Sequence, residues 1–250
     1  MWLRRTIIFC WETIVTTQMI HVFWDFCRKI LYLVKLLVPL EEKMNSLLST
    51  AYWPNIHYFY YVLNSTKISI EQFENYQKQS FRNRTIILSA NGPLDLSIPI
   101  IKKAPKELTK DVEISYKENW QSKHWRAITS AYKNSPYFEH FESEIQSLYT
   151  KKHQGLLEFN LKQLEQIQTI LRIKKNISLS SSYEKNVTDF LDLRESIHPK
   201  LDYRTDKIVQ KTLLNPYYQT FEDKFPFIPN LSILDLLFNK GLDTLGHLNA

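Results

Sequence analysis

The sequence predicts an α/β fold: a single mixed α/β domain whose central sheet includes a β-hairpin and whose C-terminal half is rich in helices. Short apolar or alternating segments bounded by turn residues run from Met44 to about residue 115, which is typical of strands. From residue 120 onward, apolar residues recur at helical spacing. The hydrophobic fraction of 44% in 250 residues suffices for a sizeable core. No internal repeat or linker divides the chain after Met44.

The first predicted elements form a β-α start followed by a second strand. Pro54 ends the first strand, and Asn55 directly after it is a good helix cap. Alternation of polar and apolar residues indicates the second strand, and the polar stretch that follows is expected to be helical. In order, these elements are a strand at 47–53, a helix at 56–63, a strand at 67–70 and a helix at 71–80.

A β-hairpin is the clearest local prediction. Residues 85–90 and 94–100 flank Asn91-Gly92, and in the second segment leucine and isoleucine alternate with polar residues. Pro93 cannot donate the backbone hydrogen bond that would close a two-residue turn at Asn91-Gly92. We therefore expect a loop somewhat longer than two residues.

Helices dominate the predicted second half. The helix that begins at Gly155 carries one apolar stripe that faces the core. Ser232 and Asp235 have the spacing of a capping box, which explains Asp235 better than catalysis does, and Gly241 is the expected stop. Residues 189–211 show no firm period. The remaining predicted elements are strands at 112–115 and 176–180 and helices at 120–132, 136–149, 155–173 and 230–240.

Residues 1–43 form an apolar N-terminal extension of a domain at 44–250. The stretch 6–24 has the length of a membrane span, but a glutamate, a glutamine and a histidine interrupt it. Three interpretations stay open: a pair of interfacial helices at the inner-membrane surface, a weak spanning segment, or an extension foreign to the natural protein. We favour the third, because Met44 is followed directly by a plausible first strand.

Composition excludes several classes of chemistry. Both cysteines precede Met44, so the domain has neither a disulfide framework nor a thiol nucleophile. Four glycines form no phosphate-binding loop, the histidines are isolated, and no Asp-x-Asp pair occurs, so no metal site is predicted and no cofactor is identified. The net charge of +6 is interleaved with acids, which argues against a nucleic-acid partner.

The first candidate binding segment runs from residue 76 to 84 and leads into the hairpin. In an extended chain Arg82 and Arg84 point to the same side, where two guanidinium groups could bind a phosphate or carboxylate. The alternative is that they are solubilising charges on an edge strand. The other substrate-binding candidates in this segment are Tyr76, Lys78 and Asn83.

The second candidate segment is the start of the helix at 120–132. At helical spacing Trp120, Lys123 and Arg126 share a face, which suits an anionic or sugar ligand. His124 points elsewhere and is the candidate general acid or base, since its ordinary pKa is near neutral. The alternative is that His124 is an ordinary core or surface group.

Two further candidates come from the end of the first predicted strand. His57 lies in the region where open α/β sheets commonly form a ligand crevice, and Tyr52 precedes it. The tyrosines and phenylalanine that follow His57 are explained by packing.

Several of these segments together resemble the WbqC-like protein family, in the same order and over essentially Met44 to Gly241. The run Lys78-Gln79-Ser80-Phe81-Arg82-Asn83-Arg84 is the most distinctive. The other matching segments are Leu48 to Pro54, Asn91-Gly92, Leu96 to Pro99, Trp120 to Arg126, Ala131-Tyr132, Pro136 to Phe138, Tyr217 to Phe221 and Asn230 to Asn239. Residues 1–43 fall outside the resemblance.

The resemblance implies a bacterial, cytoplasmic protein connected with O-antigen or lipopolysaccharide biosynthesis. We expect an enzyme that acts on an activated sugar or another small anionic molecule, as an N-acyl or aminoacyl transferase. Arg82, Arg84, Lys123 and Arg126 would bind the anionic part and His124 would move the proton, in a pocket lined by Tyr52, Tyr76 and Trp120. The alternative is a non-catalytic scaffold protein of a polysaccharide-assembly complex, held at the inner membrane by residues 1–43.

Overall fold

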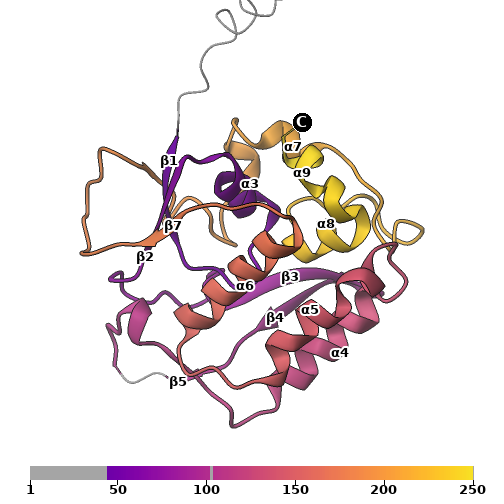
Figure 1. The fold of residues 1–250 in the computed structure, drawn as a ribbon, viewed down its shortest axis with the longest axis horizontal. Helices are drawn as coiled ribbons and strands as arrows, with labels where there is room; N and C mark the ends of the chain where they lie inside the picture. The colour runs from indigo at the N-terminus through magenta and orange to yellow at the C-terminus, as the bar shows by residue number, and fades with distance from the viewer. Residues whose placement is uncertain (1–43, 102–103, 250) are drawn as a thin grey trace, which may run out of the picture. The chain divides into compact units, whose positions relative to one another are not determined.

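The computed structural model describes residues 44–101 and 104–249, and the prediction for residues 1–43 lies outside them. The described residues have the predicted mixed α/β fold (Figure 1). Its centre is a four-stranded parallel sheet in the order β7-β2-β1-β8. The strands are β1 (Asn45–Ser49), β2 (Lys67–Glu71), β7 (Ile177–Leu179) and β8 (Leu191–Asp192).

The predicted β-α start is confirmed. Helix α3 (Ile56–Asn64) connects β1 to β2, and the side chain of Asn55 accepts a hydrogen bond from the backbone of Tyr58, so Asn55 is the cap. Strand β1 ends at Ser49, earlier than predicted. The N–H groups of Tyr52 and Trp53 bond instead to the carbonyl of Phe81 and the side chain of Gln163.

The helix predicted at 71–80 is wrong. This segment is irregular, because its backbone pairs with residues 107–110: Tyr76 N donates to Glu107 O, and Thr109 N donates to Glu74 O. The Glu71 carboxylate also accepts from the backbone of Phe73, which turns the chain out of β2. These bonds replace the bonds of a helix.

The predicted hairpin is confirmed, and the prediction of a longer loop is wrong. Strands β3 (Arg84–Ser89) and β4 (Gly92–Ser97) pair up to Ser89 and Gly92, so the turn is the dipeptide Ala90-Asn91. This register leaves Pro93 opposite Leu88, in a pair that exchanges no backbone hydrogen bonds. The N–H that Pro93 lacks is therefore not needed.

Three helices pack side by side in the order α4 (Trp120–Tyr132), α5 (Phe138–Thr150) and α6 (Leu156–Ile170), and α4 also packs against strand β3 of the hairpin (Figure 1). They confirm the helices predicted between residues 120 and 173, with small differences at the ends. The short strands β5 (Ile100–Ile101) and β6 (Glu113–Ile114) pair beside the 3-10 turn η1 (Thr109–Asp111).

The C-terminal segment closes the core against α3 and α5. Its last predicted helix is confirmed as α8, although it begins at Ile233 rather than at residue 230, and Gly241 ends it with φ of 60°. None of the helices in the described part of the chain is both long and apolar enough to span a bilayer. The elements of this segment are η2 (Tyr203–Thr205), α7 (Gln210–Leu214), α8 (Ile233–Lys240), η3 (Gly241–Asp243) and α9 (Thr244–Leu248).

The capping box at the start of α8 forms only in part. The Ser232 hydroxyl accepts from the backbone of Leu234, as a cap should. The Asp235 carboxylate is instead buried and accepts hydrogen bonds from Tyr217 Oη at 2.6 Å and Gln219 Nε2 at 3.1 Å. The backbone N–H of Ser232 donates to Ile86 O, so it needs no bond from Asp235.

Candidate functional site

Charged side chains gather where the four parallel strands end. Strand β1 ends at Ser49 and β2 at Glu71, while Arg194 closely follows β8. The carboxyl ends of parallel strands share one edge of the sheet, and in open α/β sheets this edge is where ligands bind. We call the polar side chains at this edge the carboxyl-edge cluster: Ser49, Glu71, Glu74, Arg82, Asp192 and Arg194.

Arg82 is the first buried cation of the cluster, with 2% of its surface exposed. Its Nε donates to Glu74 Oε1 at 2.7 Å and its Nη2 to Glu74 Oε2 at 2.6 Å, and Nη2 also donates to the Ser49 hydroxyl. Burial raises the pKa of the Glu74 carboxyl, and the bonds from Arg82 oppose that rise. Arg82 therefore positions Glu74 and joins the irregular segment after β2 to the end of β1.

Arg194 is the second buried cation. Its Nε and Nη2 donate to the two carboxylate oxygens of Asp192 at 2.9 and 2.6 Å, and its Nη1 lies 3.3 Å from Glu71 Oε2. The bonds from Arg194 lower the pKa of Asp192. The other oxygen of Glu71 accepts from the hydroxyl of Ser180, the first residue after β7. One hydrogen-bonded group thus links the ends of β2, β7 and β8.

Two hollows of about 280 Å³ each open at this edge. The loop 180–190, which projects beside β7 in Figure 1, lines both. The acidic hollow is lined by Leu47, Ser69, Glu71, Leu179, Ser180, Ser181, Ser182, Glu184, Val187, Thr188, Asp189 and Phe190. The mixed-charge hollow is lined by Phe73, Glu74, Asn75, Gln77, Tyr183, Lys185, Asp192, Arg194 and Glu195.

The two hollows differ in charge. The acidic hollow has three carboxylates and four serine hydroxyls in its lining and no lysine or arginine. The mixed-charge hollow has both acids and cations, and the ring of Tyr183 lies 4.9 Å from the Arg194 guanidinium. The Glu71–Arg194 pair joins them, because Glu71 lines one hollow and Arg194 lines the other.

Three of the predicted site residues, Tyr52, Trp120 and His124, meet in the interior. Tyr52 Oη lies 2.8 Å from His124 Nδ1 and 2.8 Å from Tyr149 Oη, and the Trp120 ring packs edge-on against His124. Burial lowers the pKa of His124 to about 4, against a hydrogen bond with the backbone of Ser97 that raises it. His124 is therefore neutral near pH 7, and it lines neither hollow.

The predicted cations of the two basic segments face different partners. Lys123 Nζ lies 2.8 Å from Glu118, and Arg126 Nε donates to the carbonyl of Ser122 in its own helix. Arg84 Nη1 lies 3.5 Å from Asp95 on the neighbouring strand. The hairpin nevertheless brings the segments 76–84 and 120–126 close together. Ser97 on β4 pairs with Arg84 on β3, and the backbone of Ser97 forms a hydrogen bond with His124.

The remaining predicted residues lie apart from the cluster or at its rim. His57 is buried in the first turn of α3, with Nε2 2.9 Å from Asp206, and burial lowers its pKa. Burial raises the pKa of Tyr76 to about 12. Lys78 is exposed, and Asn83 donates to the carbonyl of Ile98 within the hairpin.

Sequence reasoning missed Glu71, Glu74, Asp192 and Arg194. The rule that ligands bind at strand ends was applied to the first strand, and the same rule applied to the strand at 67–70 would have found Glu71. Arg194 lies in the segment 189–211, which gave no periodic signal. In residues 44–101 and 104–249, no three His, Cys, Asp or Glu side chains gather in a way that could hold a metal ion.

The comparisons with known proteins identify a family. The model of the WbqC-like protein family matches residues 50–207 of the chain. This range contains the strands β2, β7 and β8 and, apart from Leu47, all the residues that line the two hollows, whereas β1 lies just before it. It ends before the resembling segments at 217–221 and 230–239. No curated protein and no solved structure matches the chain.

Proposed function

The chain belongs to the WbqC-like protein family, and from that premise we propose that it is an enzyme of bacterial surface-polysaccharide biosynthesis that transfers an acyl or aminoacyl group to an amino sugar. The observation that carries the proposal is the carboxyl edge of the sheet, where two hollows of different charge meet at the Glu71–Arg194 pair. Two joined hollows suit a reaction of two substrates.

The acidic hollow suits the amino sugar. A sugar presents hydroxyls. The serine hydroxyls of the lining can both donate hydrogen bonds to them and accept hydrogen bonds from them, and the carboxylates can accept. An amino sugar also carries an ammonium group, which the carboxylates of Glu184 and Asp189 attract; the Glu71 carboxylate is already paired with Arg194. No cation of the lining opposes it.

The mixed-charge hollow suits the group that is transferred. An aminoacyl group carries an amine, which Glu74 or Glu195 can bind, and a carbonyl oxygen, which gains negative charge when it is attacked. The Arg194 guanidinium lines this hollow and is held in place by Asp192. Arg194 is thus placed to stabilise that charge.

The chemistry requires a base as well as a cation. The ammonium group of the sugar loses one proton to solvent before its nitrogen can attack. A carboxylate then accepts a second proton from that nitrogen while the new C–N bond forms and the leaving group departs with the electrons of the broken bond. Glu74 is the carboxylate of the mixed-charge hollow whose pKa burial raises. This brings its proton affinity closer to that required of a base near neutral pH.

Binding can be tested with the full chain by isothermal titration calorimetry. Glucosamine should bind more tightly than glucose, because only glucosamine has an ammonium group for the acidic hollow. Glu184→Gln and Asp189→Asn should each weaken glucosamine binding by about threefold to tenfold. Both side chains are exposed, so the fold should be unaffected, and the exposed Glu222→Gln is the control. Equal binding of the two sugars would contradict the proposed substrate.

The transfer step is tested separately by mass spectrometry. Glucosamine incubated with acetyl-coenzyme A and the full chain should gain the mass of an acetyl group. The gain should fall sharply in Lys185→Ala, because Lys185 is an exposed cation of the mixed-charge hollow that attracts the phosphates of coenzyme A and does not line the acidic hollow. Binding of glucosamine without any transfer would contradict the enzymatic part of the proposal and favour a binding protein.

A further inference from the structure

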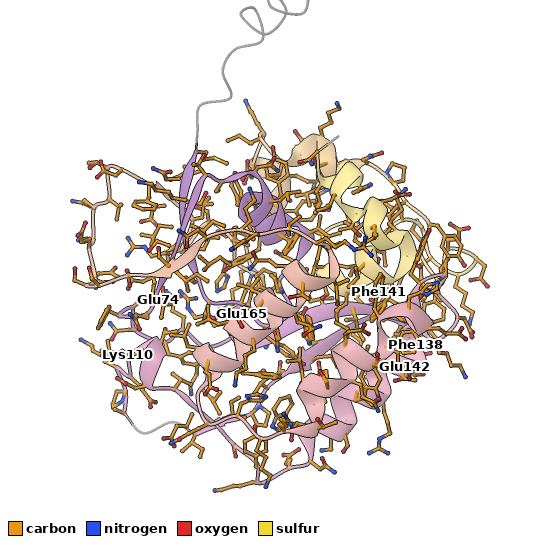
Figure 2. The ribbon with its side chains drawn as sticks, viewed as in Figure 1. Glu74, Lys110, Phe138, Phe141, Glu142 and Glu165 are labelled. Carbon is orange, nitrogen blue, oxygen red and sulfur yellow. The ribbon has the colours of Figure 1, made fainter. Side chains whose placement is uncertain are left out.

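A third hollow, on the helical side of the molecule, combines cations with aromatic rings. It measures about 360 Å³ and lies between the start of α5, the end of α6 and the end of α8. We call it the cation–aromatic groove; its lining includes Tyr137, Phe141, Arg172, Lys240 and Asp243. In Figure 2, Phe141 lies far from Glu74, so the groove is separate from the carboxyl-edge cluster.

The two cations of the groove have no acidic partner. Among the residues that the structure describes, no carboxylate lies within ion-pair distance of Arg172 or Lys240. This differs from Arg194, which lines the mixed-charge hollow and is held by Asp192. Two unpaired cations from different elements leave the groove ready to accept an anion.

Arg172 adopts a backbone conformation that is unfavourable for arginine. Its φ is 56°, in the left-handed region, at the position just after α6 where glycine is preferred. The backbone of Ile173 donates to Gln168 O, which completes the usual closure of a helix end. A glycine would satisfy this closure at lower cost. The backbone therefore gives no reason for arginine here, whereas its side chain lines the groove.

Two aromatic rings and one acid also line the groove. Tyr137 is fixed in place, because its ring packs against Gly241 and its N–H donates to Phe238 O. Phe141 is half-buried beside it, one helical turn further along α5. Asp243 is exposed at the rim, where its carboxylate can accept hydrogen bonds from hydroxyl groups.

From these three features we infer that the cation–aromatic groove is a binding site for a nucleoside monophosphate. Arg172 and Lys240 bind the phosphate, the Tyr137 and Phe141 rings contact the base, and Asp243 accepts hydrogen bonds from the ribose hydroxyls, as acidic residues do in other nucleotide sites. The volume of the groove is at the lower end of the range for small-molecule sites. The groove is independent of the proposed transferase site.

The test uses calorimetric titration of the full chain with AMP, adenosine and inorganic phosphate. AMP should bind more tightly than either fragment, because only AMP engages both the cations and the rings. Arg172→Gly and Lys240→Gln should each weaken AMP binding by about tenfold. Lys174→Gln is the matched control, since Lys174 is an exposed cation two residues from Arg172 that does not line the groove.

The Arg172→Gly variant separates binding from folding. Because glycine adopts a positive φ freely, the melting temperature of this variant should stay the same or rise by about 2 °C while its AMP binding weakens about tenfold. AMP binding that survives Arg172→Gly and Lys240→Gln would overturn the inference, as would adenosine or phosphate binding as well as AMP. Failure of AMP to bind the unaltered chain would overturn it too. None of these outcomes bears on glucosamine binding at the carboxyl edge.

Discussion

The buried titratable side chains of this protein link its stability to pH. His124 and Asp235 are both almost completely removed from solvent, and in both cases burial is the main cause of a large pKa change. Burial favours the neutral form of each group. For a histidine this lowers the pKa and for an aspartate it raises the pKa, so the two residues make stability change with pH in opposite directions.

His124 should destabilise the fold as the pH falls. Its pKa drops from 6.5 in the unfolded chain to about 4 in the fold, so below pH 6.5 the unfolded chain takes up the proton first. The contribution is complete above pH 6.5 and is lost as the pH falls to about 4, by up to about 3 kcal/mol. Urea unfolding of His124→Gln at several pH values should show a smaller acid loss than the unaltered chain. Substitution of the exposed His140 by Gln should leave the loss unchanged.

Asp235 should act in the opposite sense. Its pKa rises from 3.8 to about 6, because burial outweighs the hydrogen bonds from Tyr217 and Gln219. The folded state therefore keeps a proton that the unfolded chain loses, and stability falls by up to about 3 kcal/mol as the pH rises from about 4 to 6. Asp235→Asn should remove this fall, whereas the exposed Asp223→Asn should keep it. An Asp235→Asn profile parallel to that of the unaltered chain would contradict the assignment.

The buried Arg82–Glu74 pair should be costly to break. Arg82→Met leaves Glu74 charged and unpaired in the interior, which costs about 3–5 kcal/mol. Adding Glu74→Gln should recover part of that loss, so a double-mutant cycle in urea should show strong coupling. The exposed pair Lys162–Glu158 is the control: its distance is also 2.6 Å, yet breaking it should cost only about 0.3–0.5 kcal/mol. Similar coupling in the two pairs would contradict the role given to burial.

At the level of secondary structure, one glycine ends helix α8 and another begins strand β4. Gly241 ends α8 with a positive φ, and a Cβ there would lie 2.7 Å from the Tyr137 ring. Gly92 follows the hairpin turn with φ of 100°, and a Cβ there would meet Phe225 at an ordinary 3.8 Å. Both positions need glycine for their backbone, but only Gly241 needs it for space as well.

This difference predicts an order of stability. Gly241→Ala should cost about 2 kcal/mol or more and Gly92→Ala about 1 kcal/mol, because only the first adds a steric clash to the backbone strain. Gly246→Ala, within α9 and with open space around its Cβ position, should stabilise the protein by about 0.5–1 kcal/mol. Thermal unfolding of the three variants tests the order, and a larger loss for Gly92→Ala than for Gly241→Ala would reverse it.

Local patterns predicted most elements, and long-range hydrogen bonds account for the failures. The cap at Asn55, the hairpin and the helices α4 to α6 depend on neighbouring residues, so periodicity and turn chemistry sufficed. The segment 71–80 failed because its backbone pairs with residues about 35 positions away, which no local pattern reveals. Strand β8 was not predicted for the same reason, because its two residues pair with Ser46 and Leu47 of the distant strand β1.

At the scale of the whole molecule, parallel pairing creates the candidate site. Glu71 and Arg194 are 123 positions apart in sequence, and they meet only because β2 and β8 flank β1. The sequence pattern indicated Arg82 as a candidate anion-binding residue, but it did not indicate that Glu74 pairs with it. The sequence shows where the cations are, but it does not show which carboxylates the fold places beside them.

The most direct test of the central claim, that substrate binds at the carboxyl edge of the parallel sheet, is hydrogen–deuterium exchange of the full chain with and without saturating glucosamine. Binding at this edge should slow exchange in the loop 180–190 and in residues 71–75, with no change in residues 120–126. Protection of residues 120–126 and of the hairpin, with the loop 180–190 unchanged, would show instead that the sugar binds elsewhere.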